Sequence, residues 1–235
     1  EGEATGLSFD EAGRVDGVLL AEGERIPARL VIAADGRRSV LRGAASLPLR
    51  DLGAPMDVFW FRLPKTAHSG NDTMGIFEAG RLLVLINRHD YWQTAYVFPK
   101  GTADVVRARG LPLFRSEIAR LAPEVADVVD SLTDWDQVKL LSVSLDRLER
   151  WHRPGLLAIG DAAHAMSPVG GVGINLAIQD AVAAANLLAA PLLDDDDIDA
   201  HLGLVQKRRM FPTRIVQRMQ KAMHDNIIGS LFQPD

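Results

Sequence analysis

Residues 160–175 read GDAAHAMSPVGGVGIN, and no other part of the chain is as informative about its structure. It follows a short apolar run, residues 156–159, and it opens into a long amphipathic segment, residues 174–193. The pattern predicts a buried strand that ends on the carboxylate of Asp161, a turn closed by Pro168, a glycine-rich loop and the start of a helix.

This arrangement indicates a binding site for a small polar ligand. A carboxylate at a strand end accepts hydrogen bonds from the hydroxyls of a sugar or sugar alcohol. Glycines before a helix let the backbone approach a ligand, and the free N–H groups of the first turn then point at it with the positive end of the helix dipole. A glycine-rich turn without a ligand is the alternative interpretation, but the full pattern is much more specific than such turns require.

The order of these parts resembles the second flavin-binding motif of the aromatic-hydroxylase group of FAD-dependent monooxygenases, the relatives of p-hydroxybenzoate hydroxylase. In that family the Asp contacts the ribitol chain of FAD, the Pro and glycines lie along the isoalloxazine ring, and the helix points its N-terminus at the flavin. The resemblance places Pro168, Gly170 and Gly171 around the flavin ring and assigns no acid or base. The cofactor contacts that it implies are Gly160, Asp161, Ala162, Pro168, Gly170, Gly171, Val172, Gly173, Ile174 and Asn175.

Two further residues match the same motif, His164 and Asp180. The neighbours of His164 are small and apolar, which favours a packed or hydrogen-bonded histidine over a general base. For Asp180 we expect a structural role, as the partner of a basic side chain.

A second motif precedes the first by more than a hundred residues. Residues 30–42 read LVIAADGRRSVLR, a short β-branched run that predicts a buried strand, then a turn at Asp35-Gly36 and a helix capped by Ser39. It looks like the Asp-Gly motif of the same family, which lies between the FAD pyrophosphate and the route of NAD(P)H. The resemblance implies that Asp35 and Gly36 lie near the pyrophosphate, and it makes Arg38 and Arg42 candidates for binding dinucleotide phosphates. Arg37 is expected to be an ordinary solvated surface charge.

The Gly-x-Gly-x-x-Gly turn with which the family begins has no counterpart in this sequence. The first residues predict instead a hairpin, with one strand at 15–20, a turn at 21–24 and a second strand at 26–34. We therefore expect a fragment that lacks its N-terminal nucleotide-binding unit and holds FAD poorly alone. The resemblance extends from about residue 15 to about residue 220.

The expected fold is α/β, a partial Rossmann-like FAD-binding layer interleaved with an antiparallel sheet that carries helices. Strands are predicted at 56–63, 73–78, 81–87, 91–98 and 138–145, and broken helices between 102 and 132. In the family this sheet forms one wall of the substrate cavity. The expected domains are 1–50 and 146–193 for the flavin, 51–145 for the substrate, and a C-terminal helical segment at 194–235.

Composition fits an enzyme domain. The chain of 235 residues has a net charge of −5 and no dense basic cluster, which argues against nucleic-acid binding. It has no cysteine, so disulfides and thiolate chemistry are excluded, and a reducing cytoplasm is the expected location. The acidic run at 194–197 predicts a solvated linker that caps a helix near Ile198, and we expect no metal site. The apolar stretches look too short to cross a bilayer.

The predicted last helix, with basic residues at 207–209, is amphipathic. In the family this region covers the flavin domain or meets a partner subunit, so a homodimer is left open, and a role at a membrane surface is disfavoured for this charge density.

The resemblance implies a monooxygenase that uses NAD(P)H and O₂ to hydroxylate an aromatic or other hydrophobic small molecule through a flavin C4a-hydroperoxide. Three alternatives stay open. They are a flavin enzyme of the same fold without oxygen insertion, such as a reductase, a nicotinamide-only dehydrogenase, and an inactive fragment of the hydroxylase fold.

Overall fold

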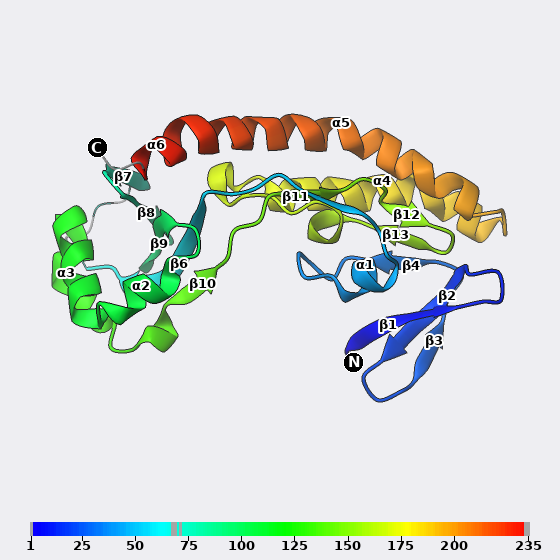
Figure 1. Ribbon diagram of the computed structural model, residues 1–235, viewed down its shortest axis with the longest axis horizontal. Helices are drawn as coiled ribbons and strands as arrows, with labels where there is room; N and C mark the ends of the chain where they lie inside the picture. The colour runs from blue at the N-terminus through cyan, green and yellow to red at the C-terminus, as the bar shows by residue number, and fades with distance from the viewer. Residues whose placement is uncertain (1, 67–69, 71, 233–235) are drawn as a thin grey trace. The chain divides into compact units, whose positions relative to one another are not determined.

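The computed structural model describes residues 2–66, 70 and 72–232 (Figure 1). The chain divides into two compact units, each built from two segments of the sequence. Unit 1 comprises Glu1–Gly53 and Ser144–Lys221, and unit 2 comprises Ala54–Val143 and Ala222–Asp235. Residues 194–221 thus group with unit 1, whereas the sequence led us to expect a separate C-terminal segment. The mixed α/β class with an antiparallel sheet is confirmed.

Unit 1 contains three small sheets. The first is antiparallel, in the order β1 (Ala4–Phe9), β2 (Val15–Leu20) and β3 (Arg25–Pro27). The second has the order β12 (His152–Arg153), β13 (Leu156–Ala158) and β4 (Val31–Ala33), and β13 runs parallel to β4. The third is a ribbon of β5 (Leu49–Asp51) and β11 (Asp146–Leu148).

Two predictions for this part of the chain were wrong. The strand expected at 26–34 is two strands in different sheets, because it is interrupted after Pro27, which has no N–H to donate to a ladder. The hairpin begins with β1, which the sequence did not reveal because Gly6 and polar residues obscure its alternation.

The helices of unit 1 enclose its core. A short helix, α1 (Val40–Ala44), follows β4, and the long helix α4 (Gly173–Leu193) is followed by α5 (Asp199–Met223), which turns back along it (Figure 1). Alanines allow α4 to approach its neighbours closely. The buried side chains of this core come from both long helices and from β13, and they include Ala183, Ala184, Leu188, Leu202, Val205, Leu156 and Leu157.

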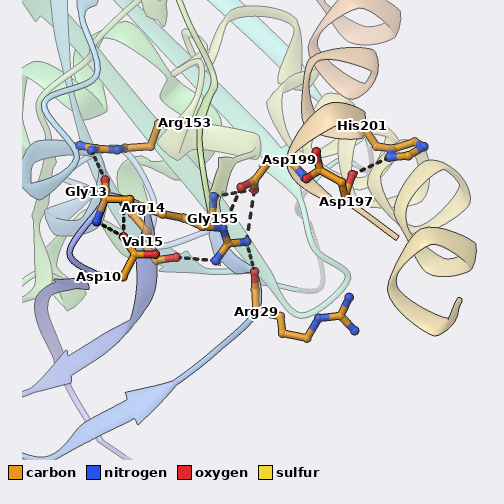
Figure 2. A network of polar contacts seen from close by, with 11 residues as sticks. Asp10, Gly13, Arg14, Val15, Arg29, Arg153, Gly155, Asp197, Asp199 and His201 are labelled. Atoms are coloured by element: carbon orange, nitrogen blue, oxygen red, sulfur yellow. Dashed lines mark hydrogen bonds and ion pairs between the residues drawn. The ribbon is translucent and has the colours of Figure 1, made fainter. Parts of the chain in front are cut away.

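A network of polar contacts ties the start of α5 to the hairpin and to the turn before β13 (Figure 2). Asp199 accepts hydrogen bonds from Arg14 Nε at 2.7 Å and from the Gly155 amide at 2.7 Å. Gly155 has φ +77° and an added Cβ would lie 1.9 Å from the Val15 carbonyl oxygen, so only glycine fits there. Asp197 accepts from the Asp199 amide at 3.1 Å, which confirms that the acidic run caps this helix.

By length and composition, one helical segment of the described residues could cross a membrane, Val169–Leu193, whose most apolar 18-residue window has a mean hydropathy of 1.6. The prediction that no apolar stretch is long enough was therefore wrong. Only 28% of its most apolar window is buried. The segment also contains Asp180, which is fully buried and ion-paired to Arg209 within unit 1.

Unit 2 is built on an antiparallel sheet in the order β10 (Lys139–Leu141), β6 (Met56–Pro64), β9 (Tyr91–Pro99), β8 (Arg81–Asn87) and β7 (Met74–Glu78). The predicted strand at 138–145 is confirmed only for Lys139–Leu141. The broken helices are confirmed as α2 (Ala103–Ala108), α3 (Leu111–Leu121) and the 3₁₀ helix η1 (Pro123–Ser131), followed by η2 (Trp135–Gln137). Near the C-terminus, η5 (His224–Ile228) and α6 (Gly229–Leu231) complete the unit.

Most aromatic rings of unit 2 are core residues. Phe59 packs against Phe98 and Phe114, with ring centroids 4.6 and 6.1 Å away, and against Trp135 of η2. Trp92 is fully buried. The alternating strand β6 sends Phe59, Phe61 and Leu63 into this core.

Candidate flavin site

The two motifs found in the sequence meet at one edge of the parallel strand pair. Leu156 lies opposite Val31 and Ala158 opposite Ala33, and the Ile159 amide extends the ladder to the Ala33 carbonyl at 3.0 Å. Since the strands are parallel, both strands end at the same edge of the sheet. Ligands bind at this edge in open α/β sheets.

Asp161 follows β13 in the short 3₁₀ helix η3 (Gly160–Ala162) and pairs with a residue of the other motif. Its Oδ2 accepts a hydrogen bond from Arg37 NH2 at 3.1 Å, and each side chain is 31% exposed. The expectation that Arg37 is a solvated surface charge was therefore wrong. The reason is the parallel register, which brings together residues that lie far apart in the sequence.

Arg37 also carries an unused donor. Its NH1 is buried and has no hydrogen-bond partner among the residues that the structure describes. A buried donor without a partner is costly, so its position beside Asp161 fits a site completed by an oxygen-rich ligand.

Arg42, an expected phosphate ligand, lies between the motifs and makes contacts with the protein itself. Its guanidinium donates to the carbonyl of Ala162 at 3.2 Å and to that of Arg37 at 2.8 Å, and it lies 3.9 Å from Asp146. Arg42 thus holds the two strand ends together. Ala162 and Gly160 are buried, so they contribute backbone rather than side-chain surface.

The Asp-Gly turn has the geometry that the sequence predicts. Gly36 has φ +84°, and the Asp35 carboxylate accepts from the Leu41 amide at 3.2 Å. Ser39 caps α1 by accepting from the Arg42 amide at 2.9 Å, which confirms its predicted role. Arg38 is exposed to solvent.

The glycine loop forms the short helix η4 (Val169–Gly171) and leads from Pro168 into α4. Gly170 and Gly171 have φ +80° and +63°, which favour glycine, and both are exposed. A Cβ added at Gly173 would lie 3.3 Å from Met166 Cβ. No side chain of the described residues caps α4 after Val172, and Ile174 and Asn175 are exposed. The first amides of the helix thus lack a side-chain cap.

A buried polar network lies behind this edge. Asp180 of α4 accepts from Arg209 Nε at 2.8 Å, from His164 Nε2 at 2.5 Å and from the Gly160 amide at 3.1 Å. Burial disfavours the charged carboxylate, yet the hydrogen bonds from His164, from Arg209 and from the Gly160 amide hold the pKa of Asp180 below its usual value. The ring of Trp151 lies 4.9 Å from that of His164. The predicted structural roles of His164 and Asp180 are confirmed.

Gln220, which the sequence analysis missed, holds the loop from α5. Its side-chain amide accepts from the Ser167 amide at 3.1 Å and donates to the carbonyls of Ser167 and Val169 at 2.9 and 2.8 Å. The signal that could have found it is a polar stripe at helical spacing. The buried face of α5 includes Arg209, Thr213, Gln217 and Gln220, whereas Phe211 and Met219 are 72% and 62% exposed.

No group of three or more His, Cys, Asp or Glu that could hold a metal ion occurs in the part of the chain described by the structure. The site instead offers one carboxylate, a partly buried guanidinium with one unpaired nitrogen, two exposed glycines and an uncapped helix start. These groups suit a ligand with hydroxyls, phosphates and a ring that gains negative charge. The residues present therefore fit FAD.

The chain belongs to the family described as FAD binding domain, whose model matches residues 3–219. It is 37% identical over 218 residues to 6-methylpretetramide 4-monooxygenase of Streptomyces rimosus, covering 90% of this chain and 51% of that protein. Protoasukamycin 4-monooxygenase of Streptomyces nodosus subsp. asukaensis is 28% identical over 204 residues, with 81% of this chain and 47% of that protein covered. The chain thus spans about half the length of these curated relatives.

Among solved structures, the fold is similar to that of pqsL, a probable FAD-dependent monooxygenase from Pseudomonas aeruginosa. The TM-score is 0.77 at 24% sequence identity, and the match covers 98% of this chain and 65% of that one. The likeness supports the fold alone, since one fold carries many chemistries.

Proposed function

We propose that the full-length protein is an FAD-dependent monooxygenase that uses NAD(P)H and O₂ to hydroxylate an aromatic or other hydrophobic small molecule. The observation that carries the proposal is the pairing of Arg37 with Asp161 at the shared strand edge, beside a glycine loop and an uncapped helix. The relatives named monooxygenases, one of them 37% identical, support the same class.

In this proposal, unit 1 binds the cofactor. Asp161 accepts from the ribitol hydroxyls while Arg37 fixes its orientation, and Arg42 holds the two motifs in register. Asp35 and Gly36 lie toward the pyrophosphate. The loop of Pro168, Gly170, Gly171 and Val172 would hold the ring, and the amides of Gly173, Ile174 and Asn175 would stabilise negative charge on it. Held by these residues, FAD would supply the redox chemistry, namely acceptance of a hydride from NAD(P)H and activation of O₂ for hydroxylation of the substrate.

We propose that unit 2 recognises the substrate. It carries an open pocket of about 500 Å³ whose wall includes Trp60, Tyr91 and Arg62. The Arg62 guanidinium stacks over the Tyr91 ring at 4.7 Å from its centroid. Aromatic surface beside a fixed cation suits an aromatic compound that carries a phenolate or carboxylate.

The domain division, the cytoplasmic location and a homodimer remain predictions.

The full-length protein tests this function directly. We expect a flavin absorption spectrum, oxidation of NADPH or NADH stimulated by phenolic compounds, and one atom of ¹⁸O from ¹⁸O₂ in the product. A protein purified without flavin, and unable to bind added FAD, would refute the cofactor assignment. Substrate reduction without matching O₂ consumption would instead identify a reductase of the same fold.

A further inference from the structure

A second charged site lies in unit 1, apart from the residues assigned to the flavin. It is an open pocket of about 370 Å³ between the β5–β11 ribbon and α5, and we call it the arginine pocket. Its lining consists of Arg50, Leu52, Arg147, Arg214, Gln217, Arg218 and Lys221, and so contains five basic side chains and no acidic one.

The register of the ribbon concentrates this charge. Arg147 of β11 lies directly opposite Arg50 of β5, an arrangement in which like charges destabilise a strand pair. The neighbouring pair, Asp146 and Asp51, points to the other face because side chains alternate along a strand. There Asp146 lies 3.9 Å from Arg42 and accepts from the Ala165 amide. The nearest acids along the ribbon therefore do not neutralise the arginine pocket.

Arg147 is a buried cation whose hydrogen-bond partner is neutral. It is only 9% exposed, and its hydrogen bond of 2.5 Å goes to Gln217, a neutral amide. Within the described residues, no carboxylate forms an ion pair with Arg147, Arg50, Arg214 or Arg218. Burial, and then the charges of Arg214, Arg50 and Arg218, lower the pKa of Arg147. A buried charge surrounded by like charges is costly unless an anion compensates it.

We propose that the arginine pocket binds the phosphate group of a small phosphorylated ligand, at a site separate from the proposed flavin chemistry. Guanidinium groups match tetrahedral oxyanions because each presents two parallel N–H donors. Arg147 provides the fixed, buried donor at the base, and Arg214 and Arg218 approach from exposed positions one helical turn apart on α5. The volume is near the lower end for ligand pockets, which suits a compact ligand.

The test uses the full-length protein saturated with FAD, so that any flavin phosphate site is already filled. Pyrophosphate binding is measured by calorimetry in low salt, and binding to vesicles of phosphatidic acid and phosphatidylcholine is measured by co-sedimentation. The test variant is the double substitution Arg214→Gln and Arg218→Gln. The matched control is Arg208→Gln, which removes an exposed charge from the same helix outside the pocket.

We expect the double variant to bind pyrophosphate at least about tenfold more weakly, because charge-assisted hydrogen bonds are lost, and the control to bind within about twofold of wild type. Added KCl should weaken wild-type binding. Vesicle binding that is lost in the double variant, without pyrophosphate binding, would support the same site with a lipid as the source of phosphate. Absence of binding in both arms, or equal binding by the double variant and the control, would overturn the proposal.

Discussion

Asp180 and Arg209 form a buried ion pair of 2.8 Å although 29 residues separate them in the chain. The same carboxylate accepts from His164 and from the amide of Gly160, the residue before Asp161. One carboxylate thus joins α4, α5 and the end of the strand that carries the flavin motif. The position of the cofactor carboxylate therefore depends on a polar core and not on apolar packing alone.

We expect Asp180→Asn to destabilise unit 1 by about 3 kcal/mol at pH 7, because it leaves Arg209 buried without its counter-charge. Thermal or urea unfolding measures the effect. The exposed Asp194→Asn serves as the control and should change stability by less than about 0.5 kcal/mol. An Asp180→Asn protein as stable as wild type would show that the ion pair contributes nothing.

The same pair predicts how stability depends on pH. The folded-state pKa of Asp180 is lowered, so the unfolded state binds more protons as the pH falls. Its contribution should be fully present above about pH 5 and should decline as the pH falls through the folded pKa. The stability difference between wild type and Asp180→Asn should therefore be constant from about pH 5 to 8 and shrink below about pH 4. A difference that grew in acid would contradict this assignment.

Removing the carboxylate of Asp161 should weaken flavin binding. In the full-length protein, Asp161→Ala deletes the proposed ribitol acceptor and leaves Arg37 without its partner. We expect the dissociation constant for FAD to rise at least about tenfold, measured by the fluorescence of released flavin. Asp127→Ala removes an exposed acid from unit 2 and should leave flavin occupancy unchanged. Equal occupancy in all three proteins would refute the role of Asp161.

The sequence predicted those parts of the site that are local in the chain. The Ser39 cap, the turn at Gly36 and the glycine loop each depend on neighbouring residues, and spacing is enough to predict them. The Arg37–Asp161 pair and the Gln220 contacts depend on a parallel register and on the rotation of α5 about its axis. The spacing of polar residues on α5 marks a stripe that includes Gln220, but it gives neither the strand register nor the groups that the stripe contacts.

Helix α5 shows a second limit of prediction from the sequence. Its sequence is amphipathic, and the apolar side of such a helix is usually the buried one, but Phe211 and Met219 are exposed while Arg209, Gln217 and Gln220 are buried. Hydrophobic patterning fails here because the elements that α5 covers present polar groups, namely Asp180, the Arg147 side chain and the loop carbonyls. The helical spacing of these polar residues shows that they share one face, but whether that face is the buried one depends on the partners it meets.

The loop glycines should not tolerate a side chain. Gly170 has φ +80°, so Gly170→Ala should cost about 1–2 kcal/mol and shift the loop away from the flavin ring. Gly203→Ala is the matched control, because Gly203 lies within α5 and its added Cβ would make an ordinary contact at 3.5 Å. That control should leave stability unchanged or raise it by up to about 1 kcal/mol. Thermal unfolding should therefore show a lower melting temperature for Gly170→Ala but not for Gly203→Ala. An equal fall in melting temperature in both variants would contradict the strain argument.

Gln220 should affect flavin binding through the loop that it holds. Gln220→Ala breaks three hydrogen bonds to Ser167 and Val169, and we expect a loss of about 2 kcal/mol in stability together with weaker retention of FAD. Gln206→Ala is the matched control, since this glutamine of the same helix binds the Trp151 amide and the Glu149 carbonyl, away from the glycine loop. Both variants should lower the melting temperature, measured by circular dichroism, but only Gln220→Ala should release flavin during gel filtration. If the two variants release flavin equally, the effect comes from general destabilisation, and Gln220 does not position the loop.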